Sequence, residues 1–152
     1  GITNVKIDFI VEGNSASYLK QLSREKEVAA QIRFLGLRDR DYVYQQLHQY
    51  DLLIQPSLYE GFGLTIVEAM AARVPVLVSD IDGPLEVIEK GKYGYHFRKE
   101  NAEDMATRIA DIMNADSTQI SAMAEGAYWH ARKNFDIRNT ALNYLQEYHT
   151  YA

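Results

Sequence analysis

The chain has 152 residues, of which 47% are hydrophobic and 24% charged, as expected of a globular domain with a sizeable core. Its net charge of −5 argues against a broad nucleic-acid surface, and the lack of cysteine excludes disulfides, thiol catalysis and Cys-based zinc sites. The lack of cysteine agrees with a cytoplasmic protein, and the sequence shows no apolar run of membrane-spanning length and no signal-peptide pattern.

Short apolar runs alternate with helical patterns along the whole chain. In chain order the predicted strands are 5–11, 32–35, 52–54, 76–78 and 95–97. The predicted helices between and after them are 18–30, 41–49, 65–72, 85–89, 102–114, 118–133 and 139–148. This alternation predicts an α/β fold, a Rossmann-like parallel sheet with helices on both faces and 95–97 at an edge. We see no linker or repeat, and therefore expect one domain over 1–152.

The stretch 55–75, QPSLYEGFGLTIVEAMAARVP, carries the strongest functional signal. A strand, a glycine turn and a helix N-terminus follow one another, and such an N-terminus favours anions because its backbone N–H groups point outward. Gly61 and Gly63 allow close backbone approach, and either is suited to positive φ. We expect Thr65 to be the N-cap and Glu68 to complete a capping box.

Two carboxylates frame this turn with seven residues between them. Glu60 lies at the carboxyl end of the predicted strand 52–54, where open α/β sheets bind ligands. Glu68 lies one turn into the following helix. Because their settings differ, we expect their roles to differ.

The stretch from Glu60 to Met70, followed by Pro75-Val76, resembles the E-x7-E signature of retaining, family-4-like glycosyltransferases with the GT-B fold. The resemblance covers nearly the whole chain, in the family's order and spacing. Its other matching positions are Ile32 to Gly36, Leu52 to Ser57, Ser79-Asp80 with Gly83 and Glu86, and Gly91 with Gly94. It implies the C-terminal, donor-binding domain of such an enzyme.

The resemblance implies roles for individual residues. Glu60 would contact the transferred sugar or stabilise its developing positive charge, and Glu68 would accept hydrogen bonds from the ribose hydroxyls. The backbone at Gly36 and Leu37 would contact the base. The sugar and the distal phosphate would bind the backbone of Gly61, Phe62, Gly63, Leu64 and Thr65.

Each role has a structural alternative. Glu60 is otherwise a solvated turn carboxylate, Glu68 a capping residue and Gly36 an ordinary strand-ending glycine. Ser57 either lines the nucleotide crevice or supports the turn after Pro56. At Gly83 and Glu86, on the same edge, we favour a first-turn helix acid for Glu86.

The chain departs from the family pattern at three places. Within 12–15, where relatives carry Gly-Asp-Gly-Pro, Gly13 is the clear match. Arg73 stands where relatives carry a glycine suited to a helix C-cap. The family's strand, Arg/Lys loop and helix that precede the equivalent of 5–11 are not in this sequence. We therefore expect direct closure, a partner chain or a larger parent protein to fill the gap between 5–11 and 52–54.

The sequence therefore predicts a domain for retaining transfer of a hexose from a UDP-, GDP- or ADP-sugar to an acceptor hydroxyl, in polysaccharide, lipopolysaccharide or glycolipid synthesis. The acceptor would bind largely through an N-terminal domain, on which association with the inner face of the membrane would also depend, and the chain alone would be inactive. No cofactor or metal is expected, since the four histidines are scattered. The alternatives are a non-catalytic Rossmann-like regulatory or partner-binding module and a GT-B sugar-nucleotide epimerase. A response-regulator-like domain is disfavoured because Asp8 and Asp80 do not form its acidic cluster.

Overall fold

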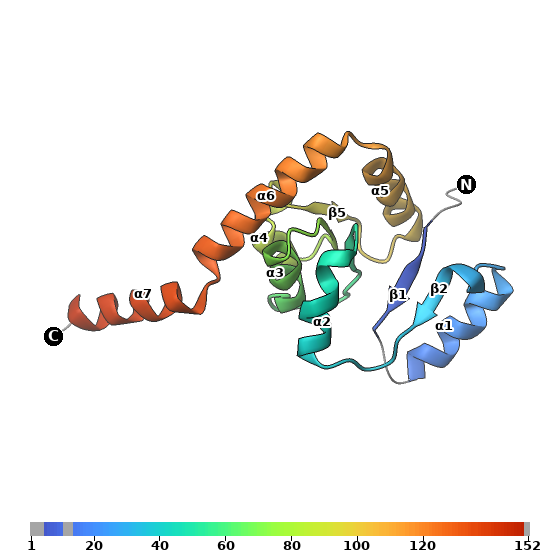
Figure 1. The fold of residues 1–152 in the computed structure, drawn as a ribbon, viewed down its shortest axis with the longest axis horizontal. Helices are drawn as coiled ribbons and strands as arrows, with labels where there is room; N and C mark the ends of the chain where they lie inside the picture. The colour runs from blue at the N-terminus through green and yellow to red at the C-terminus, as the bar shows by residue number, and fades with distance from the viewer. Residues whose placement is uncertain (1–4, 11–13, 151–152) are drawn as a thin grey trace. The chain divides into compact units, whose positions relative to one another are not determined.

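The computed structural model describes residues 5–10 and 14–150, in two compact units, Gly1–Gln45 and Gln46–Ala152 (Figure 1). The boundary falls inside α2 (Arg40–Gln46). Their strands form two separate parallel sheets, one in each unit. Among the described residues no strand bridges β1 and β3, so the interruption expected between the first and third predicted strands is present.

The first unit contains one parallel strand pair with its connecting helix. Its elements are β1 (Ile7–Phe9), α1 (Asn14–Glu25), η1 (Ala29–Gln31) and β2 (Ile32–Phe34). The register aligns Asp8 with Arg33, which form an ion pair, and Phe9 with Phe34, whose rings stack 5.4 Å apart. These cross-strand pairs hold the two strands together.

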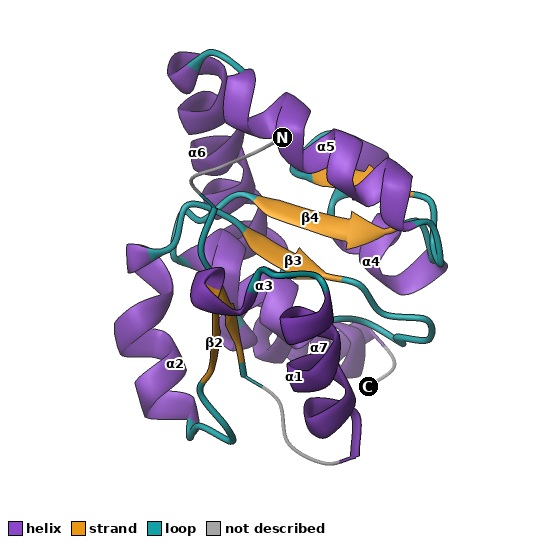
Figure 2. Cartoon of the chain, turned by 90° about the vertical axis from the view of Figure 1, so that its right-hand side faces the viewer, coloured by secondary structure: helices purple, strands orange, loops and turns teal. Residues whose placement is uncertain are grey.

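The second unit contains a three-stranded parallel sheet in the order β3-β4-β5 (Figure 2). Its elements are η2 (Leu47–Gln49), β3 (Leu53–Gln55), α3 (Leu64–Ala71), β4 (Val76–Ser79), α4 (Asp82–Val87), η3 (Glu89–Gly91), β5 (Tyr95–Phe97), α5 (Ala102–Asn114), α6 (Ser117–Asn134) and α7 (Ile137–Thr150). Strand β5 lies at one edge, as predicted.

The core of the second unit is built on the two faces of β4, all of whose residues are buried. Val76 and Val78 pack into a cluster with apolar residues of α3, α4 and α6. Leu77 points the other way, into a cluster with Phe97 and with Ile112 of α5. Successive side chains of a strand point to opposite faces of the sheet, and this alternation places the two clusters on opposite sides of β4. The predicted helices on both faces of the sheet are confirmed.

Several predicted boundaries need correction. The first helix starts at Asn14 and ends at Glu25, short of residue 30, because Glu27 adopts a left-handed φ of 57° that breaks the helix. Strand β1 is limited to Ile7–Phe9, and residue 11 lies outside the described residues. Helix α4 begins at Asp82 rather than residue 85, so Asp82, and not Glu86, is its first-turn acid.

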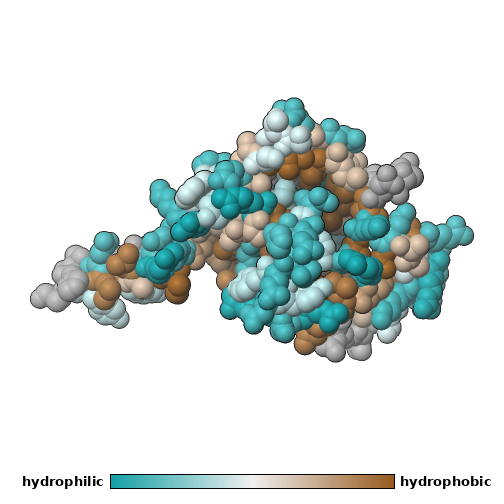
Figure 3. Space-filling model, viewed as in Figure 1, coloured by the Kyte–Doolittle hydropathy of each residue, from teal (hydrophilic) through white to brown (hydrophobic). Residues whose placement is uncertain are grey.

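Helix α7 leaves large side chains in solvent: Ile137, Leu142, Tyr144, Leu145 and Tyr148 are each at least 55% exposed. Brown, hydrophobic patches lie along this end of the molecule in Figure 3. Among the described helices, none is long and apolar enough to span a membrane.

Candidate functional site

The loop between β3 and α3, residues 56–63, is fastened to the sheet by three side-chain hydrogen bonds. The buried Ser79 hydroxyl, at the end of β4, donates to the carbonyl of Ser57. Gln55 donates from Nε2 to Ser57 Oγ over 3.0 Å, and its Oε1 accepts from Thr65 Oγ1 over 3.2 Å. The loop therefore starts and ends at fixed points, and Ser57 supports the turn as one of its two predicted roles.

Gly63, not Thr65, is the N-cap of α3, so the predicted capping box is wrong. Gly63 has φ 88° and ψ 64°, and no side chain caps the helix. This positive φ favours glycine, and a Cβ at this position would also lie 2.6 Å from Ile66 Cδ1. Because Gly63 starts the helix two residues early, Thr65 falls within the first turn and turns its hydroxyl to Gln55. The backbone N–H groups at the start of α3 therefore have no side-chain cap, and a helix end of this kind suits an anion.

The backbone at Glu60 and Gly61 lies directly on the first turn of α4. A Cβ on the buried Gly83 would come within 2.5 Å of the Gly61 carbonyl oxygen and 2.6 Å of that of Glu60. Gly83 is therefore the contact that lets the loop rest on α4. The sequence placed Gly83 at this edge, but the backbone contact joins positions more than twenty residues apart and has no local signal.

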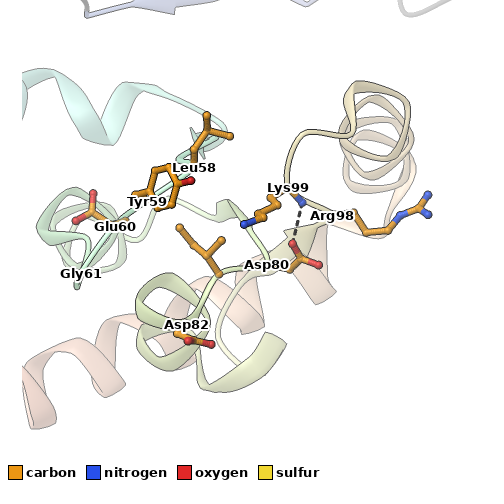
Figure 4. Close-up of a pocket in the computed structure, with 9 residues that line it drawn as sticks. Leu58, Tyr59, Glu60, Gly61, Asp80, Asp82, Arg98 and Lys99 are labelled. Atoms are coloured by element: carbon orange, nitrogen blue, oxygen red, sulfur yellow. Dashed lines mark hydrogen bonds between the residues drawn. The ribbon is translucent and has the colours of Figure 1, made fainter.

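A pocket of about 760 Å³ opens beside Glu60, at the carboxyl ends of all three strands of the second unit (Figure 4). Its lining residues are Leu58, Tyr59, Glu60, Gly61, Asp80, Ile81, Asp82, Arg98 and Lys99. This is the edge at which parallel sheets bind ligands, and the volume lies within the roughly 300–1,000 Å³ of small-molecule sites. Of the predicted site residues, Glu60 and Gly61 line it.

The charged groups of this pocket differ in how they are paired. Asp104 accepts the Arg98 backbone N–H over 2.7 Å, and that bond is the main cause of its lowered pKa; the Arg98 guanidinium lies 3.6 Å from the same carboxylate. Asp80 accepts the backbone N–H of Lys99 over 2.8 Å. Within the described part of the chain, the Lys99 ammonium forms no ion pair, and it lies 5.8 Å from the Tyr59 ring centre. Sequence reasoning missed Tyr59 and Lys99.

Phe62 ties the glycine turn to the end of α6. Its ring packs edge-on against Phe135 at 5.3 Å, and Phe135 packs edge-on against His130 at 5.4 Å. His130 stacks on Tyr93 at 4.3 Å and places its Nδ1 3.2 Å from a carboxylate oxygen of Glu89. These successive ring contacts connect Phe62 to the end of α6 and to Tyr93, and they restrict the movement of the turn at Phe62.

The remaining predicted site residues lie in both units. Glu68 is half-buried in α3, one turn beyond the N-terminus. Gly36 and the exposed Leu37 belong to the first unit, where Gly36 has φ 71° after β2. Within the described residues, no group of three or more His, Asp or Glu side chains is arranged to hold a metal.

Arg73 takes the left-handed conformation expected of a C-cap glycine, with φ 59°. The turn is therefore retained, and contacts to α6 offset its strain. The guanidinium pairs with Glu125 over 2.6 Å and lies 3.6 Å above the Tyr128 ring. The hydrogen bond from Arg73 is the main reason that the pKa of Glu125 is lowered.

Residues 2–128 match the family model described as glycosyl transferases group 1. The chain is 37% identical over 99 residues to a sucrose synthase of Nitrosomonas europaea, covering 62% of this chain and 12% of that protein. It is 28% identical over 137 residues to a glycogen synthase of Mycobacterium tuberculosis, covering 90% of this chain and 33% of that protein. The chain thus spans a third or less of the length of these relatives.

Solved structures show the same fold. A glycosyltransferase from Rickettsia africae superposes with a TM-score of 0.85 at 23% identity, over 95% of this chain and 39% of that one. Anabaena HepE in complex with UDP and glucose superposes with a TM-score of 0.78 at 25% identity, over 87% of this chain and 36% of that one. The C-terminal domain of a glycosyl transferase group 1 family protein from Francisella tularensis superposes with a TM-score of 0.72 at 23% identity, over 81% of this chain and 63% of that one. By sequence match and by fold, this chain belongs to the glycosyl transferases group 1 family, and its fold is that of a GT-B glycosyltransferase C-terminal domain.

Proposed function

We propose that the chain is the donor-binding domain of an enzyme that transfers a hexose, with retention, from a nucleoside diphosphate sugar to an acceptor hydroxyl. The observation that carries the proposal is the turn from Glu60 to Gly63. It ends in an uncapped helix N-terminus opened by a left-handed glycine. Helix dipole and first-turn N–H groups favour a phosphate there, with no side chain competing for them.

In this proposal the distal phosphate binds the backbone N–H groups from Gly63 to Thr65. Glu60, half-buried beside the pocket, faces the transferred sugar, whose anomeric carbon develops positive charge as the phosphate leaves. A carboxylate at this position stabilises that charge without forming a covalent bond. Leaving-group departure and acceptor attack on the same face give retention.

Glu68 would bind the ribose hydroxyls as a hydrogen-bond acceptor. Gly36, Leu37 and Ser57 would contact the base. UDP-glucose is the first donor to test, because the similar Anabaena structure holds UDP and glucose. The acceptor, a glycan or lipid, would bind in part through a preceding domain, which would also decide any membrane association. We expect the chain alone to transfer no sugar.

A calorimetric titration with UDP, GDP and ADP, each with and without its sugar, tests this assignment. We expect one nucleotide to bind selectively and Glu68→Ala to weaken it roughly tenfold, the value of about one charge-assisted hydrogen bond. The matched control is Glu103→Ala, which removes an exposed acid from the first turn of α5. In the full-length enzyme, Glu68→Ala should raise the KM for the donor, and the control substitution should leave this KM unchanged. Selective binding unchanged in Glu68→Ala contradicts the ribose role, and no nucleotide binding by the full-length enzyme contradicts the proposed function.

A further inference from the structure

The pocket beside Glu60 extends away from the phosphate-binding end of α3. Its lining comes from residues 58–61, from the segment after β4 and from Arg98 and Lys99 after β5. No first-turn residue of α3 contributes to it. A donor held by its phosphate at α3 and by its sugar at Glu60 therefore leaves the far part of this pocket for another molecule.

The charges that line the pocket disfavour a charged ligand in its far part. Three carboxylates, Glu60, Asp80 and Asp82, and two cations, Arg98 and Lys99, belong to residues that line the pocket, which gives a net charge of −1. One cation, Arg98, is held by Asp104, and Asp80 is used by the backbone of Lys99. An anion drawn to the Lys99 ammonium would meet the nearby carboxylates, whose repulsion offsets the attraction.

Hydroxyl groups suit a pocket that contains both a cationic donor and carboxylate acceptors, because each hydroxyl both donates and accepts hydrogen bonds. The ammonium of Lys99 donates only, and the carboxylate of Asp82 accepts only. Both line the pocket, and in Figure 4 the Lys99 side chain reaches toward Tyr59 while Arg98 points away. A neutral molecule with several hydroxyls satisfies both groups at once.

Tyr59 adds a flat apolar face to these polar groups. Its side chain is 90% exposed, although it directly precedes Glu60 and lines the pocket. The described residues leave most of this ring uncovered, so its face is open to a ligand. A sugar ring presents C–H groups on one face and hydroxyls at its edge, and it fits a site with an aromatic face and convergent polar groups.

We propose that this pocket is a subsite for a neutral acceptor saccharide, with Tyr59 as the stacking face and Lys99 and Asp82 as hydroxyl partners. The proposal rests on the proposed function, because the donor sugar at Glu60 identifies the molecule beyond it as the one that receives the sugar. Its specific content is that the receiving molecule is an uncharged sugar and that the donor-binding domain itself contacts it.

The test is saturation-transfer NMR of the chain with maltose and cellobiose as probes and glucose 6-phosphate as the charged probe. We expect the disaccharides to bind in the millimolar range and glucose 6-phosphate to bind no more tightly. Tyr59→Ala should weaken disaccharide binding roughly fivefold through loss of the aromatic face, and Tyr59→Phe should retain it. The control is Tyr148→Ala, which removes a tyrosine that is 75% exposed on α7.

Parallel titrations with UDP and UDP-glucose separate this proposal from the proposed function. Disaccharide binding that is absent, or unchanged in Tyr59→Ala, overturns the subsite even if UDP binds. A Tyr59→Ala effect confined to UDP-glucose, with UDP and the disaccharides unchanged, overturns the acceptor assignment and gives the pocket to the donor's own sugar. UDP binding that fails in the full-length enzyme counts against the proposed function, whatever the disaccharides do.

Discussion

The two units share one local plan, parallel strands joined by a helix, but they differ in how much of it is buried. All fifteen apolar side chains that form the described core, from Leu47 to Ala131, belong to the second unit. In the first unit, among the residues whose burial the structure describes, Ser23 alone is buried. Because burial of apolar surface is the main favourable term in folding, we expect the second unit to be the more stable of the two.

This difference shows why the candidate site is where it is. The loop carrying Glu60 and Gly63 contacts β4, which is buried throughout, the first turn of α4 and the end of α6. Gly36 and Leu37, the predicted base contacts, follow a strand pair held by one ion pair and one ring stack. We therefore expect the loop from Glu60 to Gly63 to be more rigid than the turn at Gly36 and Leu37.

Core truncation should show the largest contrast between the units. Leu77→Ala, in a fully buried position of β4, should lower the free energy of unfolding by about 3 kcal/mol, since it leaves a cavity between the sheet and α5. Phe34→Ala, at a half-buried position of β2, should cost about 1 kcal/mol because less apolar surface is lost. Urea unfolding measures both, and equal losses would contradict the contrast.

Crowding the loop should have the next largest effect. Gly83→Ala places a methyl group against the carbonyls of Glu60 and Gly61, which are backbone and cannot rotate away. We expect a loss of about 2 kcal/mol in unfolding free energy and weaker UDP binding.

The matched control is Gly61→Ala, where an added Cβ meets no atom within 4 Å and φ is not positive. Its stability should stay within about 0.5 kcal/mol of the original chain. Equal destabilisation by the two substitutions would show that the loop does not rest on α4.

The smallest expected effect is a pH dependence from one helix cap in the second unit. Hydrogen bonds from Thr118 lower the pKa of Asp116, the N-cap of α6. A lowered folded-state pKa contributes stability that is present above the ordinary value of about 4 and lost as pH falls through the folded value. Asp116→Asn keeps the cap but removes the titrating group, so its Tm should fall less between pH 5 and pH 2 or so than that of the original chain. Parallel Tm curves would contradict this prediction.

Much of the fold follows from local patterns. The run at 76–78 and the alternation at 95–97 have the periodicity of the strands that form there, and the helix at 102–114 has its predicted bounds. The start of α3 was misjudged because a threonine cap and a left-handed glycine are both local solutions to the same helix end. The left-handed backbone of Gly63, with φ 88°, is the solution that the structure adopts.

The site was only partly readable for a different reason. The E-x7-E spacing identified Glu60 and Gly61, which line the pocket. Tyr59 and Lys99 come from loops after different strands, and the sheet alone brings them together. An exposed tyrosine or lysine has no sequence pattern that separates it from an ordinary surface residue.

The central claim is that the donor binds on the turn between β3 and α3. The most direct measurement is the change in backbone amide chemical shifts of the full chain as UDP-glucose is added. The account predicts the largest changes at Gly61, Gly63, Leu64 and Thr65, with smaller ones at Glu68. Changes concentrated elsewhere, with those amides unmoved, would contradict it.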